Sequence, residues 1–379
     1  MLMGCIQMIK KNKSVFKVLF MVILLIFTMI GSVLIKQIPN ENGNLEKIPT
    51  TSKKIKNVIY MVGDGMGENH IIATQIYKGE KLNIQTIKNK SYVVTDSISG
   101  ATDSAAAATA LATGYKTNNG VIGKDIYGND IENLIEYTNK MGMKTGIVCT
   151  QILNHATPAG FSVHNDDRKN YDEIALSQIE SCVDLMFGGG SSYFRKYQTE
   201  MTENNFKWID SFSELSSISK DSKVIGTFAE NDIKRDKVSL AEMTQEAILR
   251  LDNENGFFLM VEGSKIDTYS HNENLSKTIN ELIDFDYAVK VAKEYVDKNK
   301  DTLLIVTADH ETGGLNLDGI TKADQLNDSL FTSNGSHTRA NVLIYAYGIG
   351  AKDLTRYNII DNTFICKFIR KGVMNNYKN

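Results

Sequence analysis

Short apolar runs alternate with stretches of helical periodicity from Asn57 to the end of the chain. Most of these runs are almost continuously apolar, which is typical of strands buried on both faces of a parallel sheet. Apolar residues recur at helical spacing between them, as in Ser239–Asp252 and Leu275–Lys300. The alternation predicts an α/β fold with a mostly parallel central sheet and helices on both faces. The predicted strands are Val58–Val62, Thr145–Cys149, Val183–Phe187, Phe257–Val261, Leu303–Thr307 and Val342–Tyr347.

The first part of the chain does not follow this pattern. Four lysines between residues 10 and 17 precede an uncharged, mostly apolar run over residues 18–35. That run is long enough to cross a bilayer as one helix, and the lysines predict a cytoplasmic N-terminus. A cleaved signal peptide is the alternative, although no clear Ala-x-Ala site follows the run, so we favour an uncleaved anchor. A buried core helix would leave the lysine cluster without a purpose.

We therefore expect four segments. Residues 1–17 form a short cytoplasmic N-terminus, residues 18–35 a membrane anchor or signal segment, and residues 36–56 a linker rich in turn formers. Residues 57–379 form the exported domain, which is either anchored at the cell surface or secreted.

Composition excludes some classes of protein. The 379 residues carry a net charge of −3 with mixed signs, so nothing indicates a surface for nucleic acid. Cys149, Cys182 and Cys366 fall in the predicted exported part, and their spacing matches no metal motif. At most one disulfide can form among these three cysteines, and the sequence assigns none.

Acidic residues follow three of the predicted strands. Asp64 comes after the first strand, Glu262 follows Val261, and Asp309 stands shortly after Thr307. Ligands of such folds bind outside the carboxyl ends of the strands. Three strands that deliver carboxylates to one edge of the sheet predict an active site there.

Ser104 begins an alanine-rich stretch that ends at Gly114. Alanine is the best helix former and glycine commonly ends helices, so this stretch predicts a helix with Ser104 at its N-terminus. Unpaired backbone N–H groups and the helix dipole make that position suitable for a phosphate or an oxyanion. An ordinary helix cap is the alternative interpretation of Ser104.

Candidate metal ligands occur in three motifs in the second half of the chain. Asp267 and His271 are four residues apart, Asp309 and His310 are adjacent, and His337 lies in a glycine-containing loop. Aspartate and histidine together suit zinc, although an Asp-x-x-x-His pair alone is more often a surface ion pair. Four of the six histidines fall in these motifs or in His155–Pro158, which favours metal binding.

These residue types suit chemistry at phosphorus. Two metals about 4 Å apart can hold the attacking and leaving oxygens of an in-line displacement. Ser104 would be the activated nucleophile, and the planar fork of Arg168 can bind two phosphate oxygens.

The chain resembles the alkaline phosphatase family, the metal-dependent phosphomonoesterases, from about Asn57 to the C-terminus. The motifs that carry this resemblance stand in the family's order. They are Val62–Gly67, Thr102–Ala106, His155–Pro158, Val261–Asp267 with His271, Thr307–Gly314, and His337-Thr338.

The resemblance implies a role for each site residue. Ser104 is the nucleophile that carries the phosphoryl group, Arg168 binds phosphate, and Asp103 orients Arg168. The implied ligands are Asp267, His271 and His337 for a first Zn²⁺, Asp64, Asp309 and His310 for a second Zn²⁺, and Asp64, Thr157 and Glu262 for a third site that usually holds Mg²⁺.

Two positions vary within the family. His155 stands where members have Asp or His, and imidazole there should weaken Mg²⁺ or admit Zn²⁺. Thr268 stands where others carry Lys, His or Trp, so phosphate affinity and product release should differ.

Other functions fit these residues less well. A phosphodiesterase commonly uses Thr and lacks the third site, and a sulfatase typically needs a Cys-x-Pro-x-Arg motif that is absent here. An inactive zinc-binding surface protein would be expected to lose Ser104, Arg168 or a metal ligand. We expect a phosphomonoesterase acting on small substrates, with a possible homodimer and the physiological substrate left open.

Overall fold

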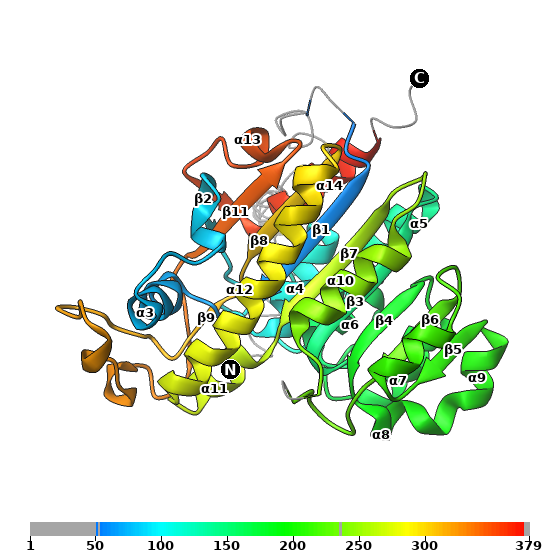
Figure 1. Ribbon diagram of the computed structural model, residues 1–379, viewed down its shortest axis with the longest axis horizontal. Coiled ribbons are helices and arrows are strands. Elements are labelled where there is room, and N and C mark those ends of the chain that lie inside the picture. The colour runs from blue at the N-terminus through cyan, green and yellow to red at the C-terminus, as the bar shows by residue number, and fades with distance from the viewer. Residues whose placement is uncertain (1–50, 52–53, 235–236, 375–379) are drawn as a thin grey trace, which may run out of the picture. The chain divides into compact units, whose positions relative to one another are not determined.

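One large sheet organises the part of the chain that the structure describes. The computed structural model describes residue 51 and residues 54–234 and 237–374. Ten strands lie in the order β12-β2-β11-β8-β1-β7-β3-β4-β6-β5 (Figure 1), and β9 pairs with β10 in a separate two-stranded sheet. The strands are β1 (Asn57–Gly63), β2 (Asn89–Val94), β3 (Lys144–Ile152), β4 (Leu185–Gly189), β5 (Phe206–Ile209), β6 (Lys223–Thr227), β7 (Phe257–Gly263), β8 (Thr302–Thr307), β9 (Glu311–Thr312), β10 (His337–Thr338), β11 (Val342–Gly348) and β12 (Ile359–Asp361).

The centre of the sheet is parallel. β1 pairs in parallel with β7 and β8, and β3 continues the same direction beyond β7. The side chains of β1 and β7 are buried along their whole length, so their sequences are apolar without alternation. The predicted α/β fold with a mostly parallel sheet is confirmed.

The prediction of a parallel strand at Val342–Tyr347 is wrong in direction. This segment forms β11, which is antiparallel to both β8 and β2. β8 ends at Thr307. The chain then makes a long excursion and comes back beside β8, without a helix that would carry it to the opposite edge of the sheet. A strand that re-enters at the edge where its neighbour ended must run antiparallel.

The sequence pattern missed four strands at the two ends of the sheet. β2, β5, β6 and β12 are short, and some carry exposed polar residues between buried ones, as Lys90 does in β2. The predicted strand Val183–Phe187 is shifted by two residues and forms β4. Asp184 precedes β4 and accepts a hydrogen bond from the backbone N–H of Thr145 at 2.9 Å.

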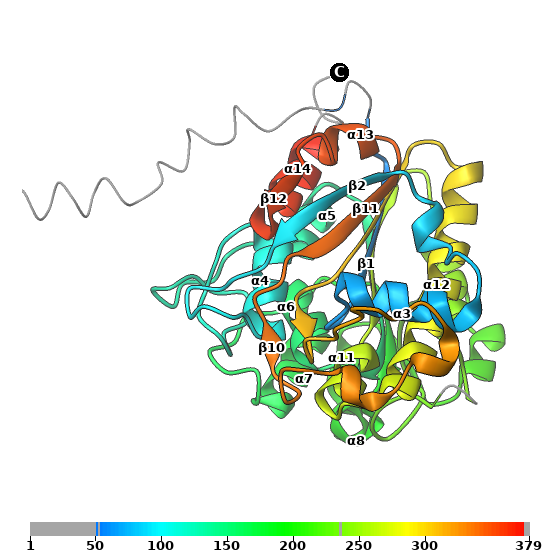
Figure 2. The ribbon, with the colours of Figure 1, turned by 90° about the vertical axis from the view of Figure 1, so that its left-hand side faces the viewer.

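Helices cover both faces of the sheet. α10 and α12 pack against β7, and so do α5 and α6. Figure 2 shows α12 on one side of β1 and α4, α5 and α6 on the other. The two helices predicted from periodicity are α10 and α12. The helices are α3 (Glu68–Lys78), α4 (Ser104–Thr113), α5 (Leu134–Lys140), α6 (Ala156–Ser162), α7 (Tyr171–Glu180), α8 (Ser191–Phe194), α9 (Gln198–Glu203), α10 (Leu240–Leu251), α11 (Lys265–His271), α12 (Leu275–Lys298), α13 (Ala351–Leu354) and α14 (Asn362–Met374), with 3₁₀ turns at Ile84–Thr86, Arg195–Tyr197, Phe212–Ser217, Ala323–Gln325 and Asp328–Leu330.

Helix α4 lies in the interior, and all of its residues are buried. Its alanines allow close contact with α6, since a Cβ on Gly160 would come within 2.6 Å of the Cβ of Ala108. Gly114 ends α4 in the left-handed conformation, at φ +81°, as predicted. Small residues therefore let α4 and α6 pack closely, and Ala105 near the start of α4 lies in one buried cluster with Ala156 at the start of α6.

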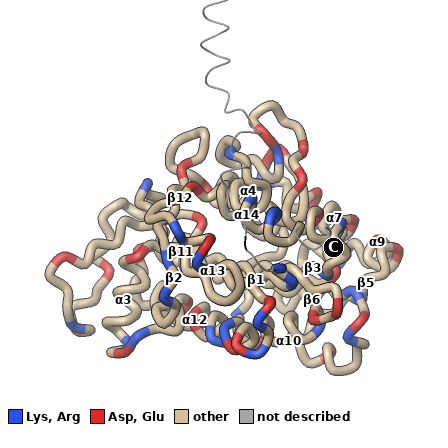
Figure 3. The backbone as a smooth tube through the Cα atoms, turned by 90° about the horizontal axis from the view of Figure 1, so that it is seen from above, with Lys and Arg blue, Asp and Glu red and all other residues tan. Residues whose placement is uncertain are grey.

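The surface of the described chain carries both signs of charge. Lysines and arginines alternate with acidic residues over most elements (Figure 3). Cys149, Cys182 and Cys366 are free among the residues that the structure describes. Within these ranges every helix is too short or too polar to cross a bilayer. The predicted membrane segment at residues 18–35 lies outside the described residues.

Candidate active site

The site begins where three neighbouring strands end. In the register of the sheet, Val62 of β1 lies beside Glu262 of β7 and Thr307 of β8. Asp64 directly follows β1 and Asp309 stands two residues after the end of β8, so three carboxylates meet at one edge. All three are completely buried.

Histidines and carboxylates, including these three, form three clusters at this edge. Within each cluster the candidate ligand atoms lie within 4.8 Å of one another. The structure thus brings together, from distant parts of the sequence, the residues predicted as ligands. The clusters are Asp267, His271 and His337; Asp64, Asp309 and His310; and Asp64, His155 and Glu262.

The first cluster lies on α11 and β10. Asp267 and His271 are one helical turn apart, and His271 Nε2 lies 3.2 Å from Asp267 Oδ2. His337 Nε2 lies 3.0 Å from His271 Nε2 and 3.6 Å from Asp267 Oδ1. Burial alone would raise the pKa of Asp267, but the two histidines hold it well below its ordinary value. Three ligand-type atoms therefore converge on one point, with one carboxylate charged.

Protein contacts fix the proton position on all three histidines of the first two clusters. Nδ1–H of His271 donates to the carbonyl of Gly335 at 2.5 Å, and Nδ1–H of His337 donates to the carbonyl of Thr102 at 2.7 Å. His310 Nδ1 lies 3.1 Å from the hydroxyl of Thr312. A proton on Nδ1 leaves the lone pair of Nε2 for a metal.

The second cluster is fully buried. His310 Nε2 lies 3.2 Å from Asp309 Oδ2 and 3.5 Å from Asp64 Oδ1. Burial, then the neighbouring carboxylates of Asp309, Asp267 and Glu262, raise the pKa of Asp64 well above its ordinary value. Such a cluster of negative charge needs a cation to be stable in its ionised form.

The third cluster shares Asp64. Burial, together with the nearby carboxylate of Asp309, raises the pKa of Glu262 to about 8. The hydroxyl of Thr157 is buried and has no hydrogen-bond partner among the described residues. These oxygens suit a hard cation such as Mg²⁺. His155 adds a nitrogen, as the sequence predicted.

Buried acceptors without partners fit bound metals. Both oxygens of Asp64, both oxygens of Glu262 and Oδ2 of Asp309 accept no hydrogen bond from the described part of the chain. Buried carboxylate oxygens are otherwise nearly always paired. The donor sets contain Asp and His in two clusters and mostly oxygen in the third, which matches zinc and magnesium respectively.

Ser104 opens α4 at this edge. Its hydroxyl is buried and lies 3.3 Å from His310 Nε2. The capping interpretation of Ser104 is wrong, because Asp103 is the N-cap and accepts from the backbone N–H of Ala106 at 3.0 Å. The Ser104 hydroxyl is therefore available for chemistry.

Arg168 stands beside Asp103, the N-cap of α4. Its Nη1 donates to Asp103 Oδ2 at 2.9 Å, and its backbone N–H donates to the carbonyl of Gly120 at 2.8 Å. Gly120 in turn donates to the same Asp103 oxygen at 3.0 Å. Burial alone would lower the pKa of Arg168, but Asp103 raises it, so the guanidinium stays charged. Asp103 thus orients Arg168 by direct contact.

The comparisons with known proteins agree with this geometry. A family model for alkaline phosphatase matches residues 55–331. The chain belongs to the alkaline phosphatase family. Alkaline phosphatase 4 of Bacillus subtilis is 40% identical over an alignment of 294 residues that covers 70% of this chain and 63% of that protein. The alkaline phosphatase of Escherichia coli is 30% identical over 376 residues, covering 80% of this chain and 79% of that protein.

Solved alkaline phosphatases share the fold. The structure of the enzyme from the Antarctic bacterium TAB5 matches with a TM-score of 0.77 at 32% identity, covering 85% of this chain and 98% of that one. The chain covers a smaller share of the Bacillus subtilis relatives, 63% and 65% of their lengths.

Two contacts around the candidate metal ligands of this alkaline phosphatase fold were not predicted from the sequence. The Thr312 hydroxyl donates to Asp267 Oδ1 at 2.5 Å and lies beside His310, so it links two clusters. Thr312 stands inside the Thr307–Gly314 motif. A hydroxyl residue so close to the candidate ligands Asp309 and His310 was the only indication in the sequence that it could contact them. Gln151 Nε2 donates to the hydroxyl of Thr268 at 2.7 Å, a contact that nothing in the sequence indicated.

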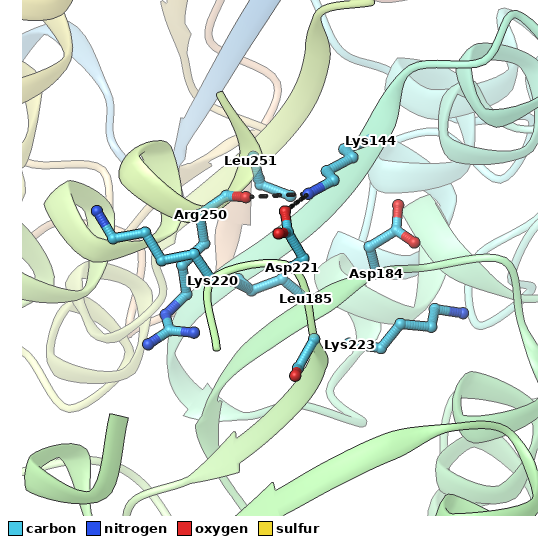
Figure 4. Close-up of a pocket in the computed structure, with 9 residues that line it drawn as sticks. Lys144, Asp184, Leu185, Lys220, Asp221, Lys223, Arg250 and Leu251 are labelled. Carbon is cyan, nitrogen blue, oxygen red and sulfur yellow. Dashed lines mark hydrogen bonds and ion pairs between the residues drawn. The ribbon is translucent and has the colours of Figure 1, made fainter. Parts of the chain in front are cut away.

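A separate pocket lies at the opposite edge of the alkaline phosphatase sheet. Lys144, Leu185 and Lys223 begin parallel strands there, and Arg250 and Asp221 complete its lining (Figure 4). Lys144 Nζ lies 3.5 Å from Asp221 Oδ1. None of the predicted site residues lines this pocket.

Proposed function

We propose that this chain hydrolyses phosphate monoesters and releases inorganic phosphate. The observation that carries the proposal is the position of the Ser104 hydroxyl. It lies at the N-terminus of a buried helix, 3.3 Å from His310 Nε2. Membership of the alkaline phosphatase family supports the same activity.

We assign metal ions to the three clusters. Asp267, His271 and His337 would hold a first Zn²⁺. A second Zn²⁺ would be held by Asp64, Asp309 and His310, and Asp64, Thr157 and Glu262 would hold Mg²⁺. The chemistry that bound cations supply here is Lewis-acid stabilisation of negative charge on the phosphoryl, attacking and leaving oxygens.

Ser104 is the proposed nucleophile. Its Oγ bonds to phosphorus and loses its proton, the bond from phosphorus to the ester oxygen breaks, and the alcohol leaves. Water then cleaves the phosphoserine and releases phosphate. The positive end of the α4 dipole favours negative charge throughout both steps.

Arg168 is the proposed phosphate-binding residue. One of its nitrogens is engaged by Asp103, which fixes the plane of the guanidinium. The remaining N–H groups can donate to two phosphoryl oxygens in one plane. Asp103 therefore contributes orientation without contacting the substrate.

His155 distinguishes the proposed third site. Arg168 Nη2 lies 3.4 Å from His155 Nε2, and a guanidinium only donates. A neutral imidazole has one lone pair, so Arg168 competes for it with any metal. We infer that this site prefers Mg²⁺ over other cations only weakly. Magnesium occupies the M3 site of a histidine-to-aspartate variant of the TAB5 enzyme.

The proposed substrates are small phosphomonoesters, because the identified contacts bind the phosphoryl group. Export, with anchoring through residues 18–35 or their removal, remains our proposal from the lysine-flanked apolar run.

The test uses the full chain purified in detergent. An aryl phosphate monoester, a diester and a sulfate ester are assayed at alkaline pH, before chelation, after chelation, and after zinc and magnesium are restored. The proposal predicts fastest hydrolysis of the monoester, lost with chelation and recovered with metal. Preference for the diester or the sulfate would contradict it, and tight zinc binding without any hydrolysis would favour a binding protein.

A further inference from the structure

Two of the six histidines lie outside the candidate metal clusters. His164 is half-buried, whereas His70 is 1% exposed and lies in the first turn of α3. Burying an imidazole is costly unless its polar atoms are hydrogen-bonded. The partners of His70 therefore indicate what this residue does.

Both nitrogens of His70 are engaged, and the partners fix the direction of each bond. The backbone N–H of Gly67 donates to Nδ1 at 3.1 Å, so the ring proton is on Nε2. Nε2 lies 3.2 Å from the hydroxyl of Ser270, which itself donates to the carbonyl of Ile266 at 2.8 Å. His70 is therefore a neutral ring that accepts from one segment and donates to another.

The two segments that His70 joins both carry candidate metal ligands. Gly67 belongs to the turn that begins at Asp64, directly after β1. Ser270 lies on α11 between Asp267 and His271. Within the described part of the chain, no backbone hydrogen bond joins this turn to α11, and the hydrogen bond from Thr312 to α11 comes from its side chain.

We propose that His70 is a positioning residue for the first metal cluster. Its hydrogen bond to Ser270 fixes the rotation of α11 against the turn after β1, so that Asp267 and His271 face His337. Contacts behind ligands of this kind commonly change metal affinity by about 10- to 100-fold. The inference rests on the proposed function, because it assumes that this cluster binds zinc.

The surroundings of His70 support a neutral donor. Glu311 Oε1 is 4.0 Å from His70 Nδ1, too far for a hydrogen bond, and this oxygen accepts from the backbone N–H of Gly314 at 2.9 Å. The other oxygen of Glu311 accepts from Thr338. The ring of Phe331 packs near the imidazole, with the ring centres 6.2 Å apart. Burial lowers the pKa of His70 to about 4.

The experiment measures zinc affinity rather than turnover. The full chain in detergent is stripped of metal and titrated with Zn²⁺ against a chromophoric chelator. The binding step that disappears in Asp267→Ala belongs to the first cluster. His70→Leu removes both hydrogen bonds, Ser270→Ala removes only the acceptor on α11, and His70→Gln keeps an N–H donor at a similar reach.

A matched control comes from the other unassigned histidine. His164 donates hydrogen bonds to the carbonyl of Gly123 and to the carboxylate of Glu136, far along the chain from α11. We expect His70→Leu to weaken the Asp267-dependent step by about 10-fold or more, Ser270→Ala to weaken it by a similar factor, and His164→Leu to leave it unchanged. His70→Gln should restore most of the affinity.

The outcomes separate this inference from the proposed function. A parent chain that binds no zinc would overturn both. A parent that binds zinc while His70→Leu and Ser270→Ala bind it equally well would overturn only this inference. A lower melting temperature of the metal-free variants with unchanged zinc affinity would also overturn it, because His70 would then serve stability alone.

Discussion

The two edges of the sheet, at the amino and the carboxyl ends of its parallel strands, differ in how their buried charged groups are hydrogen-bonded. At the amino edge, Arg250 donates to the carbonyls of Leu215 and Ser219 and to Glu246, at 2.6 to 3.1 Å. At the carboxyl edge, both oxygens of Asp64 and of Glu262 lack a hydrogen-bond partner among the described residues. Both edges contain buried charged groups, but only the first satisfies them with its own chain.

This difference distinguishes charge that supports the fold from charge that serves a ligand. A buried ion whose hydrogen bonds are all supplied by the protein contributes to a single stable structure. A buried carboxylate without partners destabilises the protein until a cation arrives. Removing charge should therefore have opposite effects on stability at the two edges.

The largest expected effect comes from the nucleophile at the carboxyl edge. Ser104→Ala should lower kcat for a phosphate monoester by roughly 10³-fold or more, because the covalent route is lost. Zinc content and melting temperature should stay close to those of the parent, since among the described residues the hydroxyl bonds only to His310. Metal analysis and calorimetry provide these controls, and unchanged turnover would exclude Ser104 as the nucleophile.

At the amino edge, Arg250→Met should lower the free energy of unfolding by about 3 kcal/mol, because buried carbonyls lose a charged donor. Monoester turnover at 25 °C should remain near the parent value. Urea unfolding measures the first quantity, and the exposed Lys220 at the same pocket offers a control. Lys220→Met should change stability by less than about 0.5 kcal/mol. Equal losses in the two variants would remove the distinction between the edges.

At the carboxyl edge, the effect of removing a charge on the melting temperature should change sign when metal is bound. At pH 9, above the Glu262 pKa of about 8, Glu262→Gln should raise the melting temperature of the chelated chain by about 2 °C or more, because it removes one of several neighbouring like charges. With metal restored, the same variant should melt below the parent, since it lacks a ligand oxygen. Calorimetry with and without chelator checks both. A variant that melts below the parent in both conditions would contradict the account.

The smallest effect concerns a polar pair that the protein satisfies by itself. Burial alone would lower the pKa of His164, but hydrogen bonds to Glu136 at 3.0 Å and to the carbonyl of Gly123 at 2.7 Å raise it. A histidine whose pKa is raised by folding stabilises the fold fully at pH values below its unfolded-state pKa, near 6.5. This contribution is lost as the pH rises above its folded-state pKa. His164→Gln should therefore cost under about 1 kcal/mol at pH 5.5 and progressively less as pH rises past 6.5. Urea unfolding across this range tests the trend, and a cost that grows with pH would refute it.

The sequence predicted the centre of the fold better than its ends. β1, β7 and β8 are buried on both faces, so their apolar runs identify them directly. β5 and β2 lie near the ends of the sheet, where exposed polar residues interrupt the pattern. The direction of β11 depends on the path of the preceding excursion, which a local pattern does not contain.

The site residues were also predictable, since motifs after the strand ends carry them. The residues that orient them were not. The carbonyls of Gly335 and Thr102 fix the protons on His271 and His337, but any residue type offers a carbonyl. Such contacts depend on the folded backbone rather than on side-chain identity, and the same holds for Gly67 beside His70.

The central claim is that Ser104 forms a covalent phosphoryl intermediate. The most direct measurement mixes the metal-loaded chain with a phosphate monoester, quenches the reaction in acid and maps the phosphorylated peptide by mass spectrometry. The account predicts a phosphoryl group on Ser104 in the parent and none anywhere in Ser104→Ala. Rapid monoester turnover by a parent that carries the phosphoryl group on another residue would contradict it.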